Sequence, residues 1–256
     1  MMSAMSKWLE TSVFALLIFA APFVAVWYGM RDIPPDRHAV ADRLDQFGSA
    51  ARTRLLPKFL RAGVAYPPEK VMLVGLKQER RLQIYAAGHD GQFRYIDDRP
   101  ILAAAGGPGP KLLAGDRQVP EGVYNIRYLN PNSIAYVSLM IGYPNSFDLA
   151  RAKEDGRKNL GGDIVIHGPT TGTAGCLAFT EEAVEDIFTL AADSGVTNTR
   201  IIIAPHDLRR SDAPKPAKAK PWLSSLYTTI SEDLGKLPYP GGSGSSSGSA
   251  MPSAAK

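Results

Sequence analysis

The chain has 256 residues, of which 45% are hydrophobic, so it can bury one sizeable core or two small ones. Its 29 Lys and Arg residues exceed its 25 acidic residues by a net charge of +4. This excess is spread along the sequence and forms no basic stripe that would follow a phosphate backbone, so nucleic acid is not an expected partner. A single cysteine excludes an internal disulfide and a cysteine-rich zinc site.

An uncharged segment near the N-terminus predicts contact with a membrane. Residues 11–30 carry no charge, and a helix rising about 1.5 Å per residue crosses a hydrocarbon core of about 30 Å over this length. Lys7 precedes the segment, Trp27 and Tyr28 lie at its far edge, and no clear small-x-small cleavage site follows. We expect an uncleaved signal anchor over residues 1–32. A removed signal peptide and a buried core helix are the alternatives.

The rest of the chain divides into three further parts. Apolar residues recur near helical spacing after Pro35, which predicts a helical spacer over residues 33–66. Residues 67–210 follow as the main domain, and residues 211–256 form a C-terminal extension whose Gly- and Ser-rich end is expected to be disordered.

The main domain is predicted to be mainly β with a few α-helices. Short β-rich runs with turn-rich separators favour a mainly antiparallel sheet or a β-sandwich. The expected strands are residues 71–77, 82–87, 92–97, 101–105, 123–129, 135–143, 163–167 and 200–204. The last of these is nearly all apolar and is therefore expected to be central in its sheet.

One helix is predicted clearly inside the β-rich region. Thr180 is a plausible N-cap, and Glu181 and Glu182 suit the positive end of a helix dipole. Apolar residues then recur at helical spacing, and Gly195 is typical of a helix end.

The residues with the clearest chemical potential lie just before this helix. His167 ends a predicted strand, and a loop of small residues then leads to Cys176, the chain's only thiol. An imidazole or a helix N-terminus can stabilise a thiolate, and the backbone N–H groups of Gly175 and Cys176 could bind an oxyanion. On spacing alone, inert packing of the Cys and a loop-bonding role for the His remain the simpler interpretation. The loop's small residues would let a substrate backbone approach closely.

Several motifs resemble the L,D-transpeptidase (YkuD-type) superfamily, and specifically its YafK-like branch. That branch has a strand ending in His-Gly followed by a short loop and Gly-Cys. The resemblance spans roughly residues 70–206. It also includes Gly-Asp-Arg-Gln-Val-Pro-Glu-Gly-Val-Tyr at 115–124, Asn-Pro-Asn-Ser at 130–133, Ser-Leu-Met-Ile-Gly-Tyr-Pro-Asn at 138–145, and Gly-Gly-Asp at 161–163.

The match departs from the better-known members of the family at the nucleophile. Those members carry Ser-His-Gly-Cys and an Arg shortly after the Cys, whereas this chain has Thr-Ala-Gly-Cys at 173–176 and then Leu-Ala-Phe. The second His and the Arg are missing, as expected in the YafK-like branch. The missing His and Arg bear on substrate preference and on any carboxylate contact that this Arg would make. The expected nucleophile and base are both present.

The resemblance implies a set of roles for individual residues. It implies Cys176 as nucleophile, His167 as general base and then acid, and Gly175 with the Cys176 amide as oxyanion site. Substrate contacts are expected from residues of the flanking segments, namely Gly168, Thr173, Tyr143 and Asn145, although Tyr-Pro-Asn at 143–145 is also typical of a simple turn. Glu121 is expected to fix a loop. No metal and no cofactor are expected, because no carboxylate and His cluster has ligand spacing.

The family also implies a substrate and a compartment. The expected activity is a cysteine acyl transfer on peptidoglycan stem peptides: a murein L,D-transpeptidase reaction through a thioester. Hydrolytic release of a peptide or a wall-linked envelope protein by the same site, and an inactive wall-binding scaffold, are the alternatives. We expect an inner-membrane anchor with the catalytic domain in the periplasm, or secretion there if the signal is cleaved.

Overall fold

The computed structural model describes residues 37–170, 172–215 and 219–240. The predicted anchor and the Gly- and Ser-rich C-terminal end lie outside these residues. Within the described ranges, no helix has both the length and the apolar character that a membrane crossing requires. The chain divides into two compact units, Met1–Ala39 and Val40–Lys256, and the description that follows concerns the second.

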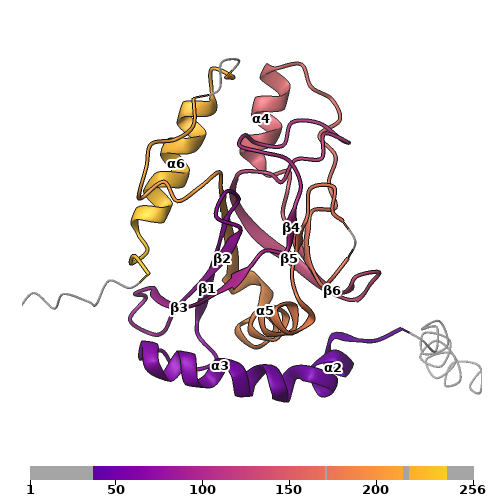
Figure 1. Cartoon of the computed structure of the whole chain (residues 1–256), viewed down its shortest axis with the longest axis vertical. Coiled ribbons are helices and arrows are strands. Elements are labelled where there is room, and N and C mark those ends of the chain that lie inside the picture. The colour runs from indigo at the N-terminus through magenta and orange to yellow at the C-terminus, as the bar shows by residue number, and fades with distance from the viewer. Residues whose placement is uncertain (1–36, 171, 216–218, 241–256) are drawn as a thin grey trace, which may run out of the picture. The chain divides into compact units, whose positions relative to one another are not determined.

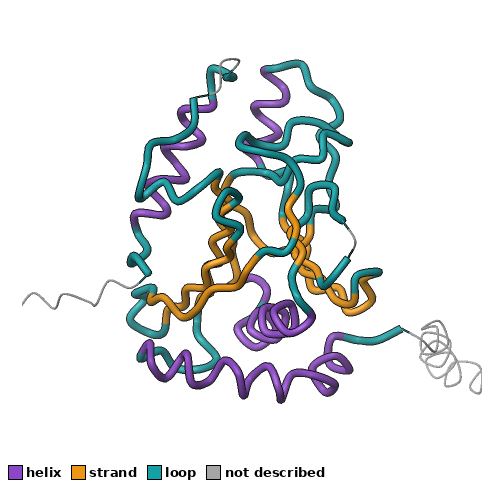
Figure 2. The backbone as a smooth tube through the Cα atoms, viewed as in Figure 1, coloured by secondary structure: helices purple, strands orange, loops and turns teal. Residues whose placement is uncertain are grey.

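The described strands of this unit form one sheet with helices on both sides (Figures 1 and 2). The strand order is β3-β2-β1-β9-β5-β6-β7-β8-β4. The pairs β1–β9 and β7–β8 are parallel, and the other neighbouring strands pair antiparallel. The strand bounds are β1 Lys70–Leu76, β2 Arg81–Ala87, β3 Arg94–Pro100, β4 Ala103–Ala104, β5 Gly122–Ser133, β6 Tyr136–Ile141, β7 Val165–His167, β8 Leu177–Ala178 and β9 Thr199–Ala204.

Strand β5 joins the two halves of the sheet. Its first residues, Gly122 to Asn125, pair with β9, whereas the residues from Ile126 onward pair with β6. A long strand that changes partners in this way makes one continuous curled sheet, so the structure has the first of the two expected arrangements, a mainly antiparallel sheet, and not a β-sandwich. The prediction of a mainly β domain with few helices is confirmed.

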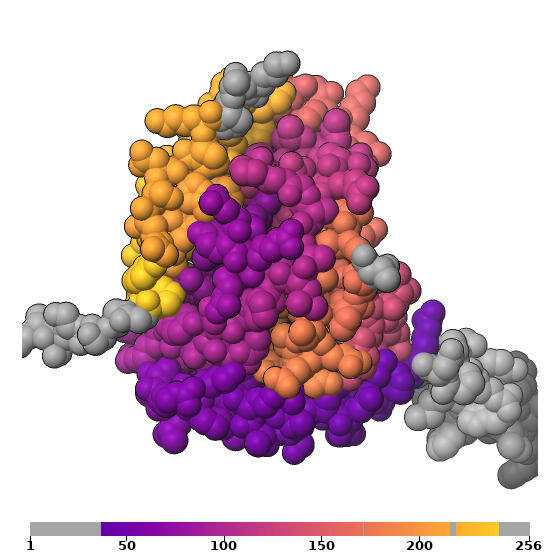
Figure 3. Space-filling view, in the orientation of Figure 1, coloured from indigo at the N-terminus to yellow at the C-terminus, as the bar shows by residue number. Residues whose placement is uncertain are grey.

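The central strands β1 and β9 are covered on both faces. Alternate side chains of β1 point to opposite faces, so Leu73 joins the core cluster that contains α5 (Glu181–Ser194), and Val74 joins the cluster that contains α6 (Leu223–Gly235). In β9, Ile201 and Ile202 divide in the same way. Burial on both faces is what the almost entirely apolar sequence of β9 predicted. Figure 3 shows that the C-terminal segment, in yellow and light orange, covers one side of the unit.

Residues 40–62 of the expected spacer are helical and pack on the domain. They form α2 (Val40–Arg43), the π-helix η1 (Leu44–Gly48) and α3 (Ser49–Ala62). Phe47, Leu55 and Phe59 are buried in the same core cluster as α5. Ion pairs add to this contact, because the Arg54 guanidinium on α3 pairs at 2.7 Å with the Asp186 carboxylate on α5. Figure 1 shows α3 passing directly below α5.

The predicted helix after Thr180 is confirmed as α5. The Thr180 hydroxyl accepts a hydrogen bond from Ala183 N at 3.2 Å, and Gly195 ends the helix with φ of +87°. Helix α4 (Ser146–Glu154) is not among the elements predicted from the sequence; it begins with a capping box between Asn145 and Asp148.

Candidate active site

His167 and Cys176 lie on neighbouring strands of the sheet. His167 is the last residue of β7, and Cys176 directly precedes β8. These strands are parallel with His167 opposite Ala178, so Cys176 lies beside Val165, two residues before His167. The Val165 amide donates to Cys176 Sγ at 3.4 Å, which agrees with this register. The two proposed catalytic residues are therefore brought together as diagonal neighbours.

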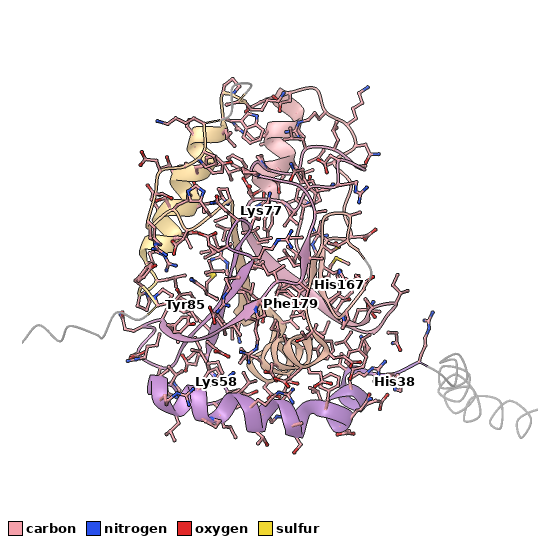
Figure 4. All side chains as sticks on the ribbon, viewed as in Figure 1. His38, Lys58, Lys77, Tyr85, His167 and Phe179 are labelled. Atoms are coloured by element: carbon pink, nitrogen blue, oxygen red, sulfur yellow. The ribbon has the colours of Figure 1, made fainter. Side chains whose placement is uncertain are left out.

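The His167 ring is held by its own loop. Its Nδ1 atom lies 2.7 Å from the carbonyl oxygen of Gly168. A carbonyl oxygen only accepts hydrogen bonds, so Nδ1 carries the proton and Nε2 of the neutral ring has a free lone pair. The group that orients His167 is thus a backbone carbonyl. Figure 4 labels His167 close to Phe179, whose amide donates to the His167 carbonyl oxygen at 2.9 Å.

The Cys176 side chain is partly exposed, and its sulfur contacts the strand-to-loop segment before β7. Besides the Val165 amide, Sγ lies 3.5 Å from the carbonyl oxygen of Asp163, to which a protonated thiol can donate. Burial raises the pKa of the Cys176 thiol. Burial also lowers the pKa of His167, against a smaller opposing effect of its hydrogen bond to Gly168.

These two shifts favour a neutral thiol beside a neutral imidazole. The expected ionised thiolate, hydrogen-bonded to His167, is not the state that this geometry favours, because neither side chain donates to or accepts from the other among the described contacts. The arrangement suits general-base catalysis, in which the proton moves during attack. Hydrogen bonds of this kind often tighten only when substrate is bound.

Two glycines permit the close packing of this site. Gly175 has φ of +122°, and a Cβ added there would lie 2.8 Å from the carbonyl oxygen of Gln118. A Cβ added at Gly168 would lie 2.7 Å from the carbonyl oxygen of Ala135. Both contacts are with backbone, which cannot move aside as a flexible side chain can, so these positions require glycine.

The expected oxyanion site is engaged within the protein. The Cys176 amide donates to the hydroxyl of Thr173 at 2.9 Å. A substrate oxygen must therefore displace this hydroxyl before it can accept from the same amide. Thr173 lies next to the nucleophile, as expected of a substrate-contacting residue, but in this structure its hydroxyl orders the loop.

Tyr143 and Asn145 are placed where they support the fold. Tyr143 is 2% exposed, and its hydroxyl lies 3.3 Å from the carbonyl oxygen of Lys111 and 3.2 Å from that of Leu160. The Asn145 side chain accepts from Asp148 N and donates to the Val123 carbonyl oxygen. Both polar groups are thus engaged with backbone groups of the protein. The turn-and-cap interpretation of Tyr-Pro-Asn describes them better, because these polar groups already bind backbone.

Two charged residues near the nucleophile were not assigned a role from the sequence. Lys111 is buried in the turn before Asp116, and Asp163 lies at the start of the segment that leads into β7. Asp163 follows a Gly-Gly pair and has φ of +54°, which marks a constrained backbone position. Lys111 lies in a Gly- and Pro-rich stretch that has no periodicity, so only the fold brings it near Cys176.

Metal binding has no support in the residues that the structure describes. Across those ranges, no group of three or more His, Cys, Asp and Glu side chains is arranged to hold an ion. The expectation that the protein uses no metal stays a prediction.

The chain matches the model of the L,D-transpeptidase catalytic domain, YkuD, over residues 69–203. It therefore belongs to the YkuD family of L,D-transpeptidase catalytic domains. The matched residues begin just before β1, end within β9, and include His167 and Cys176. Helices α2, α3 and α6 lie outside the matched range.

Curated relatives agree with this assignment. The chain is 32% identical over 143 residues to "Putative L,D-transpeptidase YafK" of Escherichia coli K12, which covers 55% of this chain and 54% of that protein. The identically named protein of Escherichia coli O157:H7 matches to the same extent. The resemblance to the YafK-like branch is confirmed, although the chain spans only about half the length of these relatives.

The chain is also similar to the solved structures of two bacterial proteins. The helical cell shape determining protein Pgp2 from Campylobacter jejuni has a TM-score of 0.44 and 22% identity, covering 61% of this chain and 52% of that chain. Bd1075 of Bdellovibrio bacteriovorus has a TM-score of 0.41 and 19% identity, covering 67% of this chain and 56% of that chain.

Proposed function

We propose that this protein is a cysteine-dependent acyl-transfer enzyme of peptidoglycan, a murein L,D-transpeptidase that remodels stem peptides through a thioester. The observation that carries the proposal is the His167 hydrogen bond to Gly168, which leaves Nε2 as a base one strand away from the chain's only thiol. Family membership supports peptidoglycan as the class of substrate.

In the proposed first half-reaction, Cys176 Sγ attacks the carbonyl carbon next to the L-centre of a diamino acid in the stem peptide. His167 Nε2 takes the thiol proton as the carbon–sulfur bond forms. The imidazolium then gives this proton to the leaving amine as the amide bond breaks. A thioester on Cys176 and a free amine result.

In the second half-reaction, an acceptor attacks the thioester. An acceptor amine gives a new amide bond and a cross-link, whereas water gives a free carboxylate. In both cases the acceptor loses a proton to His167 Nε2, and the proton returns to Sγ as the carbon–sulfur bond breaks. The chemistry at the site is the same, so the choice between transpeptidation and hydrolysis depends on which acceptor reaches it.

Stabilisation of the tetrahedral intermediate is proposed for the Cys176 amide. In the resting protein this N–H binds the Thr173 hydroxyl at 2.9 Å. A developing oxyanion is a stronger acceptor than a hydroxyl, so it can take over this donor as the intermediate forms. Gly175 keeps this stretch of backbone close to residue 118.

We further propose that the protein works in the bacterial envelope, held by its N-terminal segment and facing the periplasm. Residues 11–30 support an anchor by their length and lack of charge. A wall-linked envelope protein is a second candidate substrate if the acceptor is water. A wall-binding scaffold without catalysis is the alternative from a different class.

The test uses full-length protein, defined muropeptides and mass analysis of the products. Wild type is expected to form cross-linked or hydrolysed products, which differ in mass, and Cys176→Ala is expected to form neither. His167→Gln is the second variant, because it removes the base and leaves the thiol. Identical product spectra for wild type and Cys176→Ala would remove the enzymatic proposal and favour the scaffold.

A further inference from the structure

A buried cation, Lys111, packs against the segment that contacts the Cys176 sulfur. Lys111 is 4% exposed, and its Cε atom would lie 3.5 Å from a Cβ added to Gly161. Gly161 is two residues before Asp163, whose carbonyl oxygen is 3.5 Å from Cys176 Sγ. The Tyr143 hydroxyl lies within hydrogen-bond distance of the Lys111 and Leu160 carbonyl oxygens and ties the two segments together.

The Lys111 ammonium is fixed by two partners. Its Nζ donates to the carbonyl oxygen of Leu113 at 2.9 Å and to the Asp116 carboxylate at 2.7 Å. Asp116 also accepts from the backbone N–H groups of Leu112, Leu113 and Gln118. Its negative charge is thus shared among four donors, and the turn that holds Lys111 against the 159–163 segment is rigid.

Two side chains of opposite charge, Lys111 and Asp163, therefore lie around Cys176, and they differ in how far they are exposed to solvent. Lys111 is buried, whereas Asp163 is exposed and adjoins the sulfur through its own carbonyl group. Burial has the largest effect and raises the pKa of the thiol; the negative charge of Asp163 raises this pKa further, and the positive charge of Lys111 lowers it. His167, on β7, is the other ionisable group next to this site, and β8 contributes only Leu177 and Ala178.

We propose that Lys111 and Asp163 act as an opposed pair of charges that sets how readily Cys176 gives up its proton, with Lys111 favouring the thiolate and Asp163 opposing it. The proposal deepens the proposed function, on which it rests only in taking Cys176 as the reacting group. Lys111 acts through Cys176 and is therefore a positioning residue. Because it is buried, its influence should be almost insensitive to salt, whereas the influence of Asp163 should be screened.

The experiment measures the rate of iodoacetamide alkylation against pH for the full-length chain in a neutral detergent. Cys176 is the only cysteine, so the rate reports on a single thiol. Below the thiol pKa, this rate follows the thiolate fraction, which changes tenfold for each pH unit. The alkylation assay requires no peptidoglycan substrate, so its result is independent of whether the proposed enzymatic activity is correct.

Three variants and a control have distinct expected results. Lys111→Met should slow alkylation at pH 7 by about three- to tenfold, and Lys111→Arg should restore most of the rate. Asp163→Asn should speed it by about two- to threefold at low salt and have little effect in 1 M salt. Lys153→Met, on an exposed position of α4, should leave the profile unchanged.

Two further variants test the proposal if Lys111→Met does not fold. The double variant Lys111→Met/Asp116→Asn leaves no unpaired buried charge and should still slow alkylation. If that variant also fails to fold, Asp116→Asn keeps Lys111 without its counter-charge and should speed alkylation. A folded Lys111→Met protein with the wild-type profile, or an Asp116→Asn protein with a rate at or below that of wild type, would overturn the proposal.

Discussion

His167 Nδ1 donates a hydrogen bond to the carbonyl oxygen of Gly168, the residue that follows it, at 2.7 Å. Gly168 is in turn held by its own N–H, which donates to the Ala135 carbonyl oxygen at 3.1 Å. The orientation of the proposed base therefore depends on how closely residue 168 approaches the β5–β6 turn. The bond also selects the ring tautomer in which Nε2 is the basic atom.

A methyl group at residue 168 should disturb the base. In Gly168→Ala the new Cβ would lie 2.7 Å from the Ala135 carbonyl oxygen, so the backbone must shift. We expect a loss of about 1–3 kcal/mol in the free energy of unfolding and at least a tenfold loss of activity. Denaturant unfolding and product formation measure the two effects. Gly172→Ala is the matched control, because a Cβ there meets nothing within 4 Å; equal behaviour of the two variants would contradict the prediction.

The pH dependence of activity should report on His167. Burial lowers the pKa of its imidazole below the ordinary value of 6.5, so the neutral, basic ring persists at lower pH than in an exposed histidine. The acidic limb of kcat/KM should therefore have its midpoint below pH 6.5. His167→Gln should lower kcat/KM by about 10²–10⁴-fold and remove this limb. A midpoint above that of a free imidazole, or the same limb in His167→Gln, would argue against a neutral resting base.

Asp148 should make folding more favourable in mild acid. Burial raises the pKa of its carboxyl from 3.8 to about 6 in the folded protein. The folded state then holds the proton more tightly than the unfolded state, so this contribution is fully present below pH 3.8 and is lost as the pH rises through about 6. Asp148→Asn keeps a carbonyl oxygen for the Asn145 amide and should reduce the fall in unfolding free energy across this range by roughly 2 kcal/mol.

Urea unfolding at several pH values measures this effect. Glu154→Gln, at the exposed end of the same helix α4, is the control and should leave the pH dependence nearly unchanged. A wild-type pH profile in Asp148→Asn would show that Asp148 does not carry the linkage.

The contact between α3 and α5 should depend on one buried carboxylate. Asp186 is 0% exposed and pairs at 2.7 Å with both Arg54 on α3 and Arg99 on β3. In Asp186→Ala, two partly buried guanidinium groups lose a counter-charge, and we expect a loss of about 3 kcal/mol in the free energy of unfolding. Asp98→Ala, which removes a more exposed pair with Arg81, should cost no more than about 1 kcal/mol. Similar losses in the two variants would contradict this role for Asp186.

Sequence reasoning was most successful where a pattern is local and repeated. The apolar run at 200–204 predicted a central strand, and Thr180 with Gly195 predicted both ends of α5, because burial and capping depend on neighbouring residues. The family motifs also pointed to Cys176 and His167, whose catalytic roles stay a prediction. Membership of the family is now shown by the match over residues 69–203.

Other features could not be predicted because they depend on contacts between distant residues. Strand β8 has only two residues, too few for a recognisable period, yet it brings Cys176 beside β7. Tyr143 was expected in a groove, but its aromatic side chain is buried and its hydroxyl binds loop carbonyls. Lys111 packs beside Gly161, in the segment before β7, from a turn 65 positions before Cys176 in the chain. No local pattern encodes such an approach.

The carboxylate of Glu121 connects the shared family motif to a helix beyond it. Its Oε1 accepts from Lys77 Nζ at 3.0 Å and from Gly109 N at 2.8 Å, and its Oε2 accepts from the hydroxyl of Tyr227 on α6 at 2.9 Å. Figure 4 labels Lys77 at this network. A shortened protein that stops at residue 203, where the family match ends, would leave a fully buried carboxylate oxygen without its donor and uncover one face of β1 and β9. The segment that identifies the family therefore lacks residues that complete the hydrophobic core and the hydrogen bonds of Glu121.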